Sequence, residues 1–253
     1  MVGLEGQRVV VTGGSRGLGL GIVEALVERK ARVTVLARDR ARLAEVQRRL
    51  EISTIAGDIT DRTVAHDVIR DIKPDVLILN AGSVPKMAPI HEHTWESFSA
   101  SWENDTKAGL FWIQEAIRLP LPPGSRVLIG SSGAAINGSP LSASYAGAKR
   151  MLWIMANYAN GVSSELGLGI RFQVLVPRQV VGATDFGQHI AQTYAKRRGI
   201  TPEQFLANFG EPMTLRQYGE YVAEILTDPK HADTVAFGVK GGVGVVSLDT
   251  PTP

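Results

Sequence analysis

The glycine-rich segment T-G-G-S-R-G-L-G at residues 12–19 is the feature that most constrains the fold of this chain. It follows directly on R-V-V-V-T at 8–12, a short β-branched run that predicts a buried strand. An amphipathic helical pattern then runs from Leu18 to about Arg29. Glycines between a buried strand and a helix allow a tight turn, and the first N–H groups of the helix are left free to bind phosphate groups. The segment therefore predicts a dinucleotide-binding turn, and the alternative is a plain strand-to-helix turn.

Strand and helix patterns alternate along the rest of the chain. Further strand patterns lie at 32–36, 52–56, 75–80, 126–130, 171–176 and 242–248. Helical patterns lie at 39–50, 61–71, 94–119, 143–166 and 185–226. This order predicts an α/β fold of the Rossmann type, in which a doubly wound, mostly parallel, seven-stranded sheet carries helices on both faces. No linker or repeat is evident, so we expect residues 1–253 to form a single domain whose terminal D-T-P-T-P, at 249–253, is frayed.

Composition narrows the class of protein. A chain of 253 residues with 44% hydrophobic and 21% charged residues can form one sizeable core and is typical of a soluble globular domain. The net charge of +2 includes no basic block, which argues against a nucleic-acid surface. The absence of cysteine excludes disulfides and thiolate metal sites. Neither a signal peptide nor a long apolar span is evident, so we expect a cytoplasmic protein without a membrane anchor.

The residues after the second predicted strand indicate which dinucleotide the turn holds. NAD-binding proteins usually carry an acidic residue here for the ribose hydroxyls, but L-A-R-D at 36–39 presents Ala37 and then Arg38. Arg16, within the glycine segment, adds a second cation, and two guanidinium groups suit the 2′-phosphate of NADP. We therefore favour NADP(H) over NAD(H) as the cofactor. The alternatives are that both arginines are solvated surface residues, or that Asp39 turns inward.

Further motifs, taken together with the glycine segment, resemble the short-chain dehydrogenase/reductase family, classical type, along nearly the whole chain. They are G-D-I-T with Asp58, N-A-G at 80–82, Ser132, and Y-A-G-A-K with Tyr145 and Lys149. The resemblance implies that Asp58 binds the adenine amino group, that Ile59 contributes backbone contacts, and that N-A-G lines the cofactor cleft. Without the resemblance, N-A-G is a turn after a strand and Asp58 is equally a helix N-cap. The expected cofactor-binding residues are Gly13, Ser15, Arg16, Gly17, Leu18, Gly19, Arg38, Asp58, Ile59, Asn80, Ala81, Gly82, Tyr145, Lys149 and Pro177.

Tyr145 and Lys149 lie one helical turn apart in a run of small residues. A free tyrosine has a pKa of about 10, and an ammonium group at i+4 on the same helix face favours the phenolate and lowers that pKa. We therefore expect Tyr145 to act as a general acid toward a carbonyl oxygen or as a general base toward an alcohol. Ser132 ends the fifth predicted strand, and its hydroxyl would orient the substrate oxygen. The resemblance implies that Lys149 also holds the nicotinamide ribose, whereas an isolated Tyr–Lys pair is usually a surface pair.

Two positions depart from the family pattern. Asp105, in N-D-T-K-A-G-L-F, stands where the family usually has a catalytic asparagine. It keeps the main-chain carbonyl that the family uses in a proton relay, and its carboxylate could also bond Lys149; the alternatives are an alignment shifted by one residue to Asn104, or a tolerated replacement. Arg178 replaces the glycine that usually follows Pro177, and it faces either an anionic or carbonyl-rich substrate or the solvent.

Residues 182–212 correspond to the variable substrate lid of the family. Aromatic residues of this region either line a substrate pocket or only pack the lid, so we assign none of them to the site: Phe186, His189, Tyr194, Phe205 and Phe209. His91 and His93 resemble a metal-binding pair, but no third ligand is identifiable, and we expect them to be exposed or to contact a helix entry. No metal site is therefore expected.

Together these observations predict an NADP(H)-dependent oxidoreductase that acts on CH–OH or C=O groups of a small molecule. The simplest such enzyme is a carbonyl (ketone) reductase or alcohol dehydrogenase with Ser132, Tyr145, Lys149 and Asp105 in its catalytic site. Asp105 and Arg178 motivate one alternative, a non-redox isomerase, cyclase or dehydratase on the same scaffold. The other alternative is a protein that binds NADP without catalysis, although such a protein has no need of an acid. The resemblance also implies a homo-oligomer, a tetramer or a dimer, formed through the two long helices that carry Asp105 and Tyr145.

Overall fold

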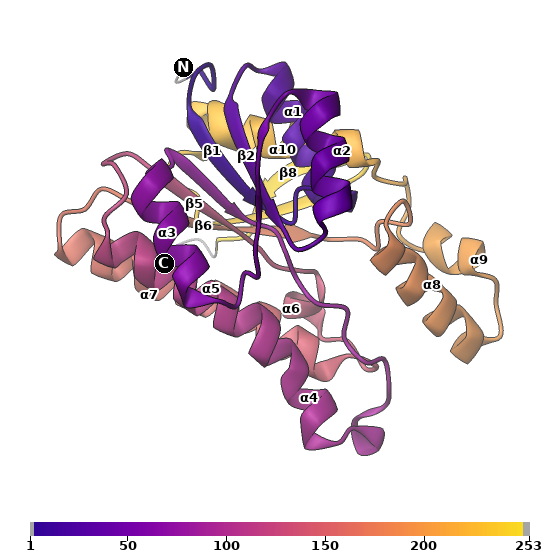
Figure 1. Ribbon diagram of the computed structural model, residues 1–253. Helices are drawn as coiled ribbons and strands as arrows, with labels where there is room; N and C mark the ends of the chain where they lie inside the picture. The colour runs from indigo at the N-terminus through magenta and orange to yellow at the C-terminus, as the bar shows by residue number, and fades with distance from the viewer. Residues whose placement is uncertain (1–2, 250–253) are drawn as a thin grey trace.

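The computed structural model describes residues 3–249, and these residues form a central sheet of eight strands (Figure 1). The strands are β1 (Arg8–Thr12), β2 (Arg32–Ala37), β3 (Ser53–Ala56), β4 (Val76–Leu79), β5 (Arg126–Gly130), β6 (Arg171–Pro177), β7 (Ala236–Lys240) and β8 (Gly244–Ser247). Their order in the sheet is β3-β2-β1-β4-β5-β6-β7-β8. The first seven strands are parallel, and β8 runs antiparallel to β7. The central strands are almost wholly buried because helices cover both of their faces.

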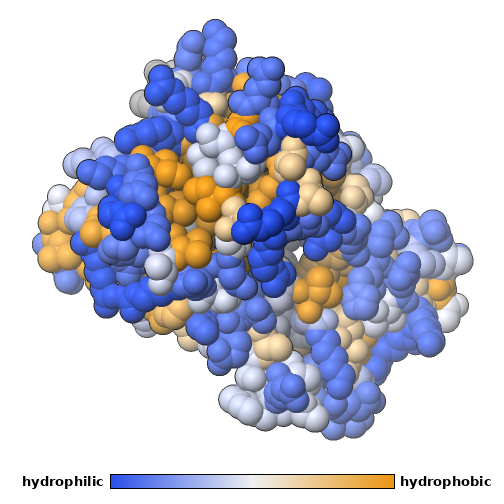
Figure 2. Space-filling model, viewed as in Figure 1, coloured by the Kyte–Doolittle hydropathy of each residue, from blue (hydrophilic) through white to orange (hydrophobic). Residues whose placement is uncertain are grey.

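Six helices form the two layers that enclose this sheet (Figure 1). On one face lie α1 (Gly17–Glu28), α2 (Arg40–Leu50) and α10 (Leu215–Thr227), and on the other lie α3 (Arg62–Ile72), α5 (Lys107–Arg118) and α7 (Ala143–Glu165). Each helix buries an apolar face; in α2, Leu43 and Val46 point inward while charged side chains form the outer surface (Figure 2). The predicted doubly wound α/β fold is therefore confirmed.

The strand order reverses between β1 and β4, which places a crevice at the carboxyl ends of these strands. Thr12 of β1 is in register with Leu36 of β2 and with Leu79 of β4, so the three strands end at the same edge of the sheet. The segments that leave this edge are the glycine turn, the loop after Leu79 and the segment after β5. In such a sheet this edge is the expected place for a ligand.

Smaller helices surround this edge of the sheet. They are η1 (Ile90–Glu92), α4 (Trp95–Ser101), α6 (Ala134–Asn137), α8 (Asp185–Arg198) and α9 (Pro202–Ala207). Another short helix, η3 (Pro229–His231), lies near the amino end of β6, where Arg171 donates to the carbonyl of Ala232. The helices α8 and α9 project away from the body of the sheet and share a small core of Ala191, Ala195 and Phe205 (Figure 1). Among residues 3–249, no helix is long and apolar enough to span a bilayer.

The structure has one strand more than the sequence predicts. The predicted strand at 242–248 is β8, whereas β7 (Ala236–Lys240) was not predicted. Gly238 lies in the middle of β7 and weakens the apolar pattern there, because glycine has low strand propensity. A Cβ atom at Gly238 would lie 2.6 Å from Cδ of Arg178, so this glycine makes room for the arginine side chain to cross β7.

Two predicted helical regions are more divided than their sequence patterns indicate. The helix at 94–119 contains a π-helical turn, η2 (Trp102–Thr106), between α4 and α5. The region 185–226 consists of three helices: α8 ends at Gly199 in the left-handed conformation, and Thr201 and Thr214 cap α9 and α10. In the predicted frayed tail, the carboxylate of Asp249 accepts hydrogen bonds from backbone N–H groups at the start of β7, and residues 250–253 lie outside the described residues.

Candidate active site

The glycine turn brings β1 and α1 into close contact. Gly13 has a φ of +69°, in the left-handed region, and a Cβ atom there would lie 2.9 Å from Cα of Ala81. A Cβ atom at Gly19 would collide with the carbonyl oxygen of Gly13 and would lie 2.6 Å from Nδ2 of Asn80. None of the described residues provides a side-chain cap for α1, so the positive end of its dipole faces the crevice. The turn therefore has room for a ligand backbone and free N–H groups to bind an anion.

A cavity of about 890 Å³ lies along the carboxyl edge of the sheet. Figure 2 shows this face of the molecule hollowed between the body of the sheet and the segment that carries α8 and α9. Every residue predicted to bind the cofactor lines the cavity, namely Gly13, Ser15, Arg16, Gly17, Leu18, Gly19, Arg38, Asp58, Ile59, Asn80, Ala81, Gly82, Tyr145, Lys149 and Pro177. Ser132 also lines it, whereas Asp105 does not. The structure thus brings these residues together, and their binding roles stay predictions.

Thr12, which sequence reasoning missed, holds the first two residues of N-A-G in place. Its hydroxyl is buried and accepts hydrogen bonds from the N–H groups of Asn80 and Ala81, each at 3.1 Å, and it donates to the carbonyl of Ile78 at 3.3 Å. These bonds tie the end of β1 to the loop after β4. Its position at the end of β1 was a signal, because a buried polar side chain at a strand end needs partners from the neighbouring strand.

Two acidic residues at the end of the cavity opposite α7 accept hydrogen bonds from residues close to them in the chain. Oδ1 of Asp58 accepts hydrogen bonds from the N–H and the hydroxyl of Thr60, both at 2.8 Å, and these bonds lower the pKa of Asp58. The N-cap of α3 is Asp61, so the alternative role of Asp58 as a helix N-cap is wrong. Asp39 caps α2 by accepting from the N–H of Arg42.

Arg16 connects the glycine turn to the predicted lid. Its guanidinium forms an ion pair with the carboxylate of Asp185, at the start of α8, with an Nη1–Oδ2 distance of 2.7 Å. Both side chains are mostly exposed at the mouth of the cavity. The pair could not be predicted from the sequence, because Arg16 and Asp185 lie 169 residues apart in the chain.

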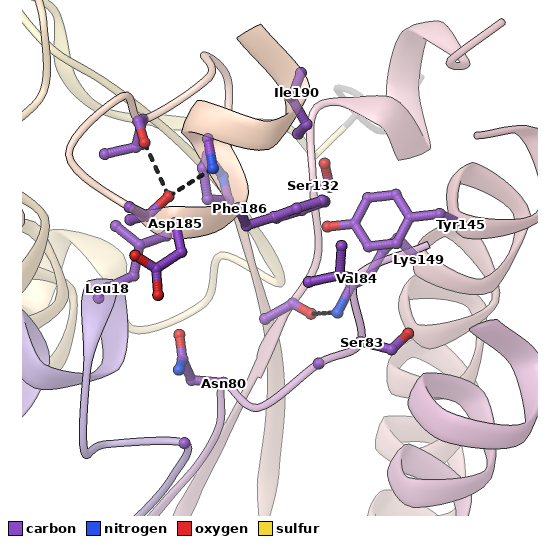
Figure 3. A pocket seen from close by; sticks show the side chains of 18 of the residues that line it. Leu18, Asn80, Ser83, Val84, Ser132, Tyr145, Lys149, Asp185, Phe186 and Ile190 are labelled. Carbon is purple, nitrogen blue, oxygen red and sulfur yellow. Dashed lines mark hydrogen bonds between the residues drawn. The ribbon is translucent and has the colours of Figure 1, made fainter. Parts of the chain in front are cut away.

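Tyr145 and Lys149 lie on the first two turns of α7, and both side chains are buried against the cavity. The ammonium group of Lys149 lies 5.6 Å from the centroid of the Tyr145 ring and donates to the carbonyl of Gly130 at 3.3 Å. In Figure 3 the hydroxyl of Tyr145 points into the cavity toward Ser132 and Phe186. The ring of Phe186 packs edge-on against the ring of Tyr145, with 5.5 Å between the centroids. The phenol is therefore directed at the space that a substrate could enter.

The direction of the Tyr145 pKa differs from the sequence-based expectation. Burial raises the pKa of Tyr145, and the carboxylate of Asp105 raises it further. Lys149 and a hydrogen bond with Ser132 act in the opposite direction, as predicted for the lysine, but they do not outweigh the other two effects. The expectation of a lowered pKa was wrong because a pattern of two residues contains neither the burial nor the nearby carboxylate.

Asp105 lies in the π-helical turn η2 and has a fully buried side chain. Its Oδ2 lies 3.1 Å from Nζ of Lys149, and its Oδ1 accepts a hydrogen bond from the N–H of Ser83 at 2.7 Å. The ion pair with Lys149, which the sequence left as one of several alternatives, is thus present. Burial alone lowers the pKa of Lys149, but Asp105 and Tyr145 outweigh burial and raise it. Lys149 therefore stays charged.

The segment after β5 supplies two serines with different tasks. The hydroxyl of Ser132 lies on the cavity wall and accepts from the N–H of Ala134 at 3.2 Å, at the start of α6. Ser131, which was not predicted as part of the site, is buried and donates to the carbonyl of Lys149 at 2.9 Å. Ser131 therefore fixes α7 relative to β5, and this bond sets the distance between Ser132 and the residues of α7.

The aromatic residues of the predicted lid and the two unassigned sequence features have defined contacts in the structure. Tyr194 and Phe205 stack with 5.4 Å between their centroids, and both line the cavity. Arg178 is exposed and lies over Gly238. Nε2 of His93 contacts the carbonyl of Ala88 at 3.1 Å and Nδ1 contacts the hydroxyl of Ser97 at 3.2 Å, so His93 contacts the entry of α4, as one of the two expectations had it.

Comparison with known proteins relates the chain to dehydrogenases and reductases. Residues 7–195 match the family model described as short chain dehydrogenase. The chain is 27% identical to an NADPH-dependent pterin aldehyde reductase of Arabidopsis thaliana, over 68% of this chain and 74% of that protein. It is 32% identical to a hydroxynaphthalene reductase of Aspergillus fumigatus, over 58% of this chain and 57% of that protein.

A solved structure shows the same fold. It is L-sorbose reductase from Gluconobacter frateurii, in complex with NADPH and L-sorbose, with a TM-score of 0.79. The alignment covers 95% of this chain and 97% of that chain at 19% sequence identity. At this identity the likeness concerns the arrangement of the sheet and helices.

Proposed function

Because the chain belongs to the short chain dehydrogenase family, and is therefore an NAD(P)-dependent dehydrogenase or reductase, we propose that it is an NADP(H)-dependent carbonyl reductase. The observation that carries this proposal is the arrangement of Tyr145, Lys149 and Ser132 on the wall of one cavity whose other end is the uncapped N-terminus of α1. A phenol directed into a cavity with an anion-binding turn suits proton transfer beside a bound dinucleotide.

The residues of the crevice fit a dinucleotide. Gly13 and Gly19 leave space that a Cβ atom would fill, and the free N–H groups of α1 suit a pyrophosphate. Asp58, held by Thr60, would bind the adenine amino group, and Lys149 would hold the nicotinamide ribose. Asn80 lies between these two ends, next to the glycine turn.

Three features support NADP(H) over NAD(H). Arg38 is exposed at the end of β2 and lines the cavity, where a 2′-phosphate would meet it. Asp39, the acidic residue that could otherwise bind a ribose hydroxyl, is engaged in capping α2. Arg16 lines the same cavity, although a phosphate must compete there with Asp185. The Arabidopsis relative, described as NADPH-dependent, adds an independent argument.

When bound in the cavity, NADPH would supply the hydride that the carbonyl carbon accepts, and it would leave as NADP⁺. Tyr145 donates its phenolic proton to the carbonyl oxygen, so a C–H bond and an O–H bond form as the C=O π bond breaks. Ser132 would hydrogen-bond the same oxygen and orient it, and the ammonium of Lys149 stabilises the phenolate that remains. Phe186 and Ile190, which lie beside Tyr145 and Ser132 in Figure 3, would help to exclude water.

A panel of aldehydes and ketones, incubated with NADPH or NADH, tests this proposal. We expect loss of the NADPH absorbance together with one equivalent of alcohol product. Tyr145→Phe should lower turnover by about 10²- to 10⁴-fold, because it removes the acid, while the affinity for NADPH stays near the wild-type value. The control is Tyr221→Phe, which changes a tyrosine of α10 that does not line the cavity.

Two outcomes would contradict the proposal, and a third would refute the role of Tyr145 alone. Product formation without net consumption of the cofactor would favour the non-redox alternative, which the unusual Asp105 and Arg178 still motivate. Tight binding of NADP that Tyr145→Phe leaves unchanged, with no turnover on any carbonyl compound, would instead favour a binding protein. NADPH-dependent turnover that survives Tyr145→Phe would refute the role of the tyrosine.

We also propose that the chain forms a homodimer or homotetramer through the helices that carry Asp105 and Tyr145. Leu110 of α5 is 40% exposed, and Tyr158 and Val162 of α7 are 72% and 38% exposed. Such apolar and aromatic side chains on two neighbouring helices are candidates for burial against a second copy. Light scattering of the purified protein measures the assembly, and a monomer at all concentrations would contradict this proposal.

A further inference from the structure

Three ionisable side chains form one buried group beside the cavity. The side chains of Asp105 and Lys149 are 0% and 5% exposed, and Tyr145 is 8% exposed as a residue. The Asp105–Lys149 ion pair has no net charge, so the group is neutral when Tyr145 carries its proton. Loss of that proton leaves one net negative charge in a buried environment, where unpaired charge is costly. The group therefore favours the phenol form of Tyr145.

The carboxylate of Asp105 contacts two parts of the site at once. One oxygen lies 3.1 Å from the ammonium of Lys149, and the other accepts from the N–H of Ser83 at 2.7 Å. Ser83 directly follows the N-A-G residues that line the cavity. The space beside Gly82 is also narrow, because a Cβ atom there would lie 3.1 Å from Nζ of Lys149 and 3.4 Å from Oδ2 of Asp105. Asp105 thus joins the cavity loop to the lysine without lining the cavity itself.

The other titratable groups that line the cavity near Tyr145 leave this charge balance unchanged. Tyr218 of α10 is 1% exposed, and burial raises its pKa, so it stays neutral. On the lid, Asp185 is already paired with Arg16. From the segment after β6, Arg178 is exposed and extends over Gly238 of β7. Besides burial, Asp105 and Lys149 are therefore the charged groups that act on the pKa of Tyr145.

We propose that Asp105 is a positioning residue whose buried carboxylate fixes Lys149 and balances its charge, so that Tyr145 is held in the phenol form that donates a proton to a substrate carbonyl. This inference rests on the proposed function, because it concerns the same acid. Reduction needs the phenol as a proton donor, whereas oxidation needs the phenolate as a proton acceptor. The raised pKa of Tyr145, which results from burial and then from Asp105, is consistent with this assignment.

The test is Asp105→Asn, which removes the charge but keeps an oxygen that can accept from the N–H of Ser83. Without the negative charge, Lys149 and the phenolate form a neutral pair. The pH midpoint for alcohol oxidation, and the midpoint at which carbonyl reduction is lost, should both move down by about one to three pH units.

A direct titration of the tyrosine gives a readout without cofactor or substrate. Phenolate absorbs in the near ultraviolet. The absorbance of the wild-type protein minus that of Tyr145→Phe reports on Tyr145 alone, and the same difference is taken for Asp105→Asn with and without Tyr145→Phe. We expect ionisation above pH ~10 in the wild-type protein, the ordinary tyrosine value, and a lower midpoint in Asp105→Asn. The matched control is Glu115→Gln, which removes another buried, paired carboxylate on α5 that does not line the cavity and should leave both midpoints unchanged.

Several results would overturn the inference. Equal midpoints in Asp105→Asn and wild type, with turnover that still depends on Tyr145, would show that the carboxylate has only a structural role. Ionisation of Tyr145 near neutral pH in the wild-type protein would overturn it even where Asp105→Asn fails to fold. Failure of the proposed function is distinguishable, because it appears as an absence of NADPH consumption by the wild-type protein, whereas the titration of Tyr145 needs neither cofactor nor substrate.

Discussion

Arg38 and Asp39 are neighbours with opposite charges at the end of β2, and the structure gives them different tasks. Asp39 accepts from the N–H of Arg42 and forms the N-cap of α2, while Arg38 is exposed on the cavity wall. The cap satisfies a helix N–H group that would otherwise lack a partner. The carboxylate is thereby engaged on α2, and the guanidinium of Arg38 is the side chain that we propose to meet the adenosine end of a dinucleotide.

We predict that Arg38→Ala changes the choice of cofactor. The KM for NADPH should rise about tenfold to a hundredfold, because hydrogen bonds between charged groups contribute about 1.5–3 kcal/mol. The KM for NADH should change little, since NADH has no 2′-phosphate. Arg40→Ala is the control, because Arg40 is also exposed on α2 but does not line the cavity. Equal changes for both cofactors would contradict the assignment.

Some residues of the site could be predicted from the sequence, and others could not. The pattern identified Tyr145, Lys149 and Ser132 because their spacing and order are specific, and the structure brings all three to one cavity. It could not give the direction of the Tyr145 pKa, which depends on burial and on a carboxylate forty residues away. Thr12 was missed because its role depends on partners in another strand.

Among the elements of the fold, the glycine turn has no room for a side chain at Gly19. A methyl group there would collide with the carbonyl oxygen of Gly13 and approach Asn80. We predict that Gly19→Ala lowers the free energy of unfolding by about 1–3 kcal/mol, the usual cost of overpacking, and abolishes nucleotide binding. Thermal unfolding and NADPH fluorescence titration measure the two effects.

The control for this substitution is Gly161→Ala in α7. A Cβ atom at Gly161 would meet no described atom within 4 Å, and the position is exposed on the helix. Because alanine has the higher helix propensity, this change should stabilise the protein by about 1 kcal/mol or less and leave nucleotide binding intact. Similar behaviour of the two variants would show that the close contact at Gly19 has no special role.

Sequence periodicity predicted most elements, and the exceptions have physical reasons. The buried, β-branched strands and the helices with one apolar face were recognised because burial imposes those patterns directly. β7 was missed because Gly238 interrupts its pattern to admit Arg178. The π-helical turn η2 keeps helical residue types throughout, so periodicity alone does not separate it from α4 and α5, although it is the turn that directs Asp105 toward Lys149.

For the whole molecule, the order of the strands is what assembles the site. The reversal of strand order between β1 and β4 gathers the glycine turn, N-A-G and the segment after β5 at one edge of the sheet. The sequence predicted this gathering through the fold class. It did not predict that Asp185 of α8 pairs with Arg16, because that contact joins two exposed side chains far apart in the chain.

The most direct test of the account is a crystal structure of the protein with NADP⁺ bound. We predict that the pyrophosphate lies on the N-terminus of α1 and that the 2′-phosphate contacts Arg38. The nicotinamide ring should face the hydroxyl of Tyr145, with the ribose held by Lys149. A nucleotide bound outside the cavity, or a phenol that points away from the ring, would contradict the proposed catalytic role of Tyr145.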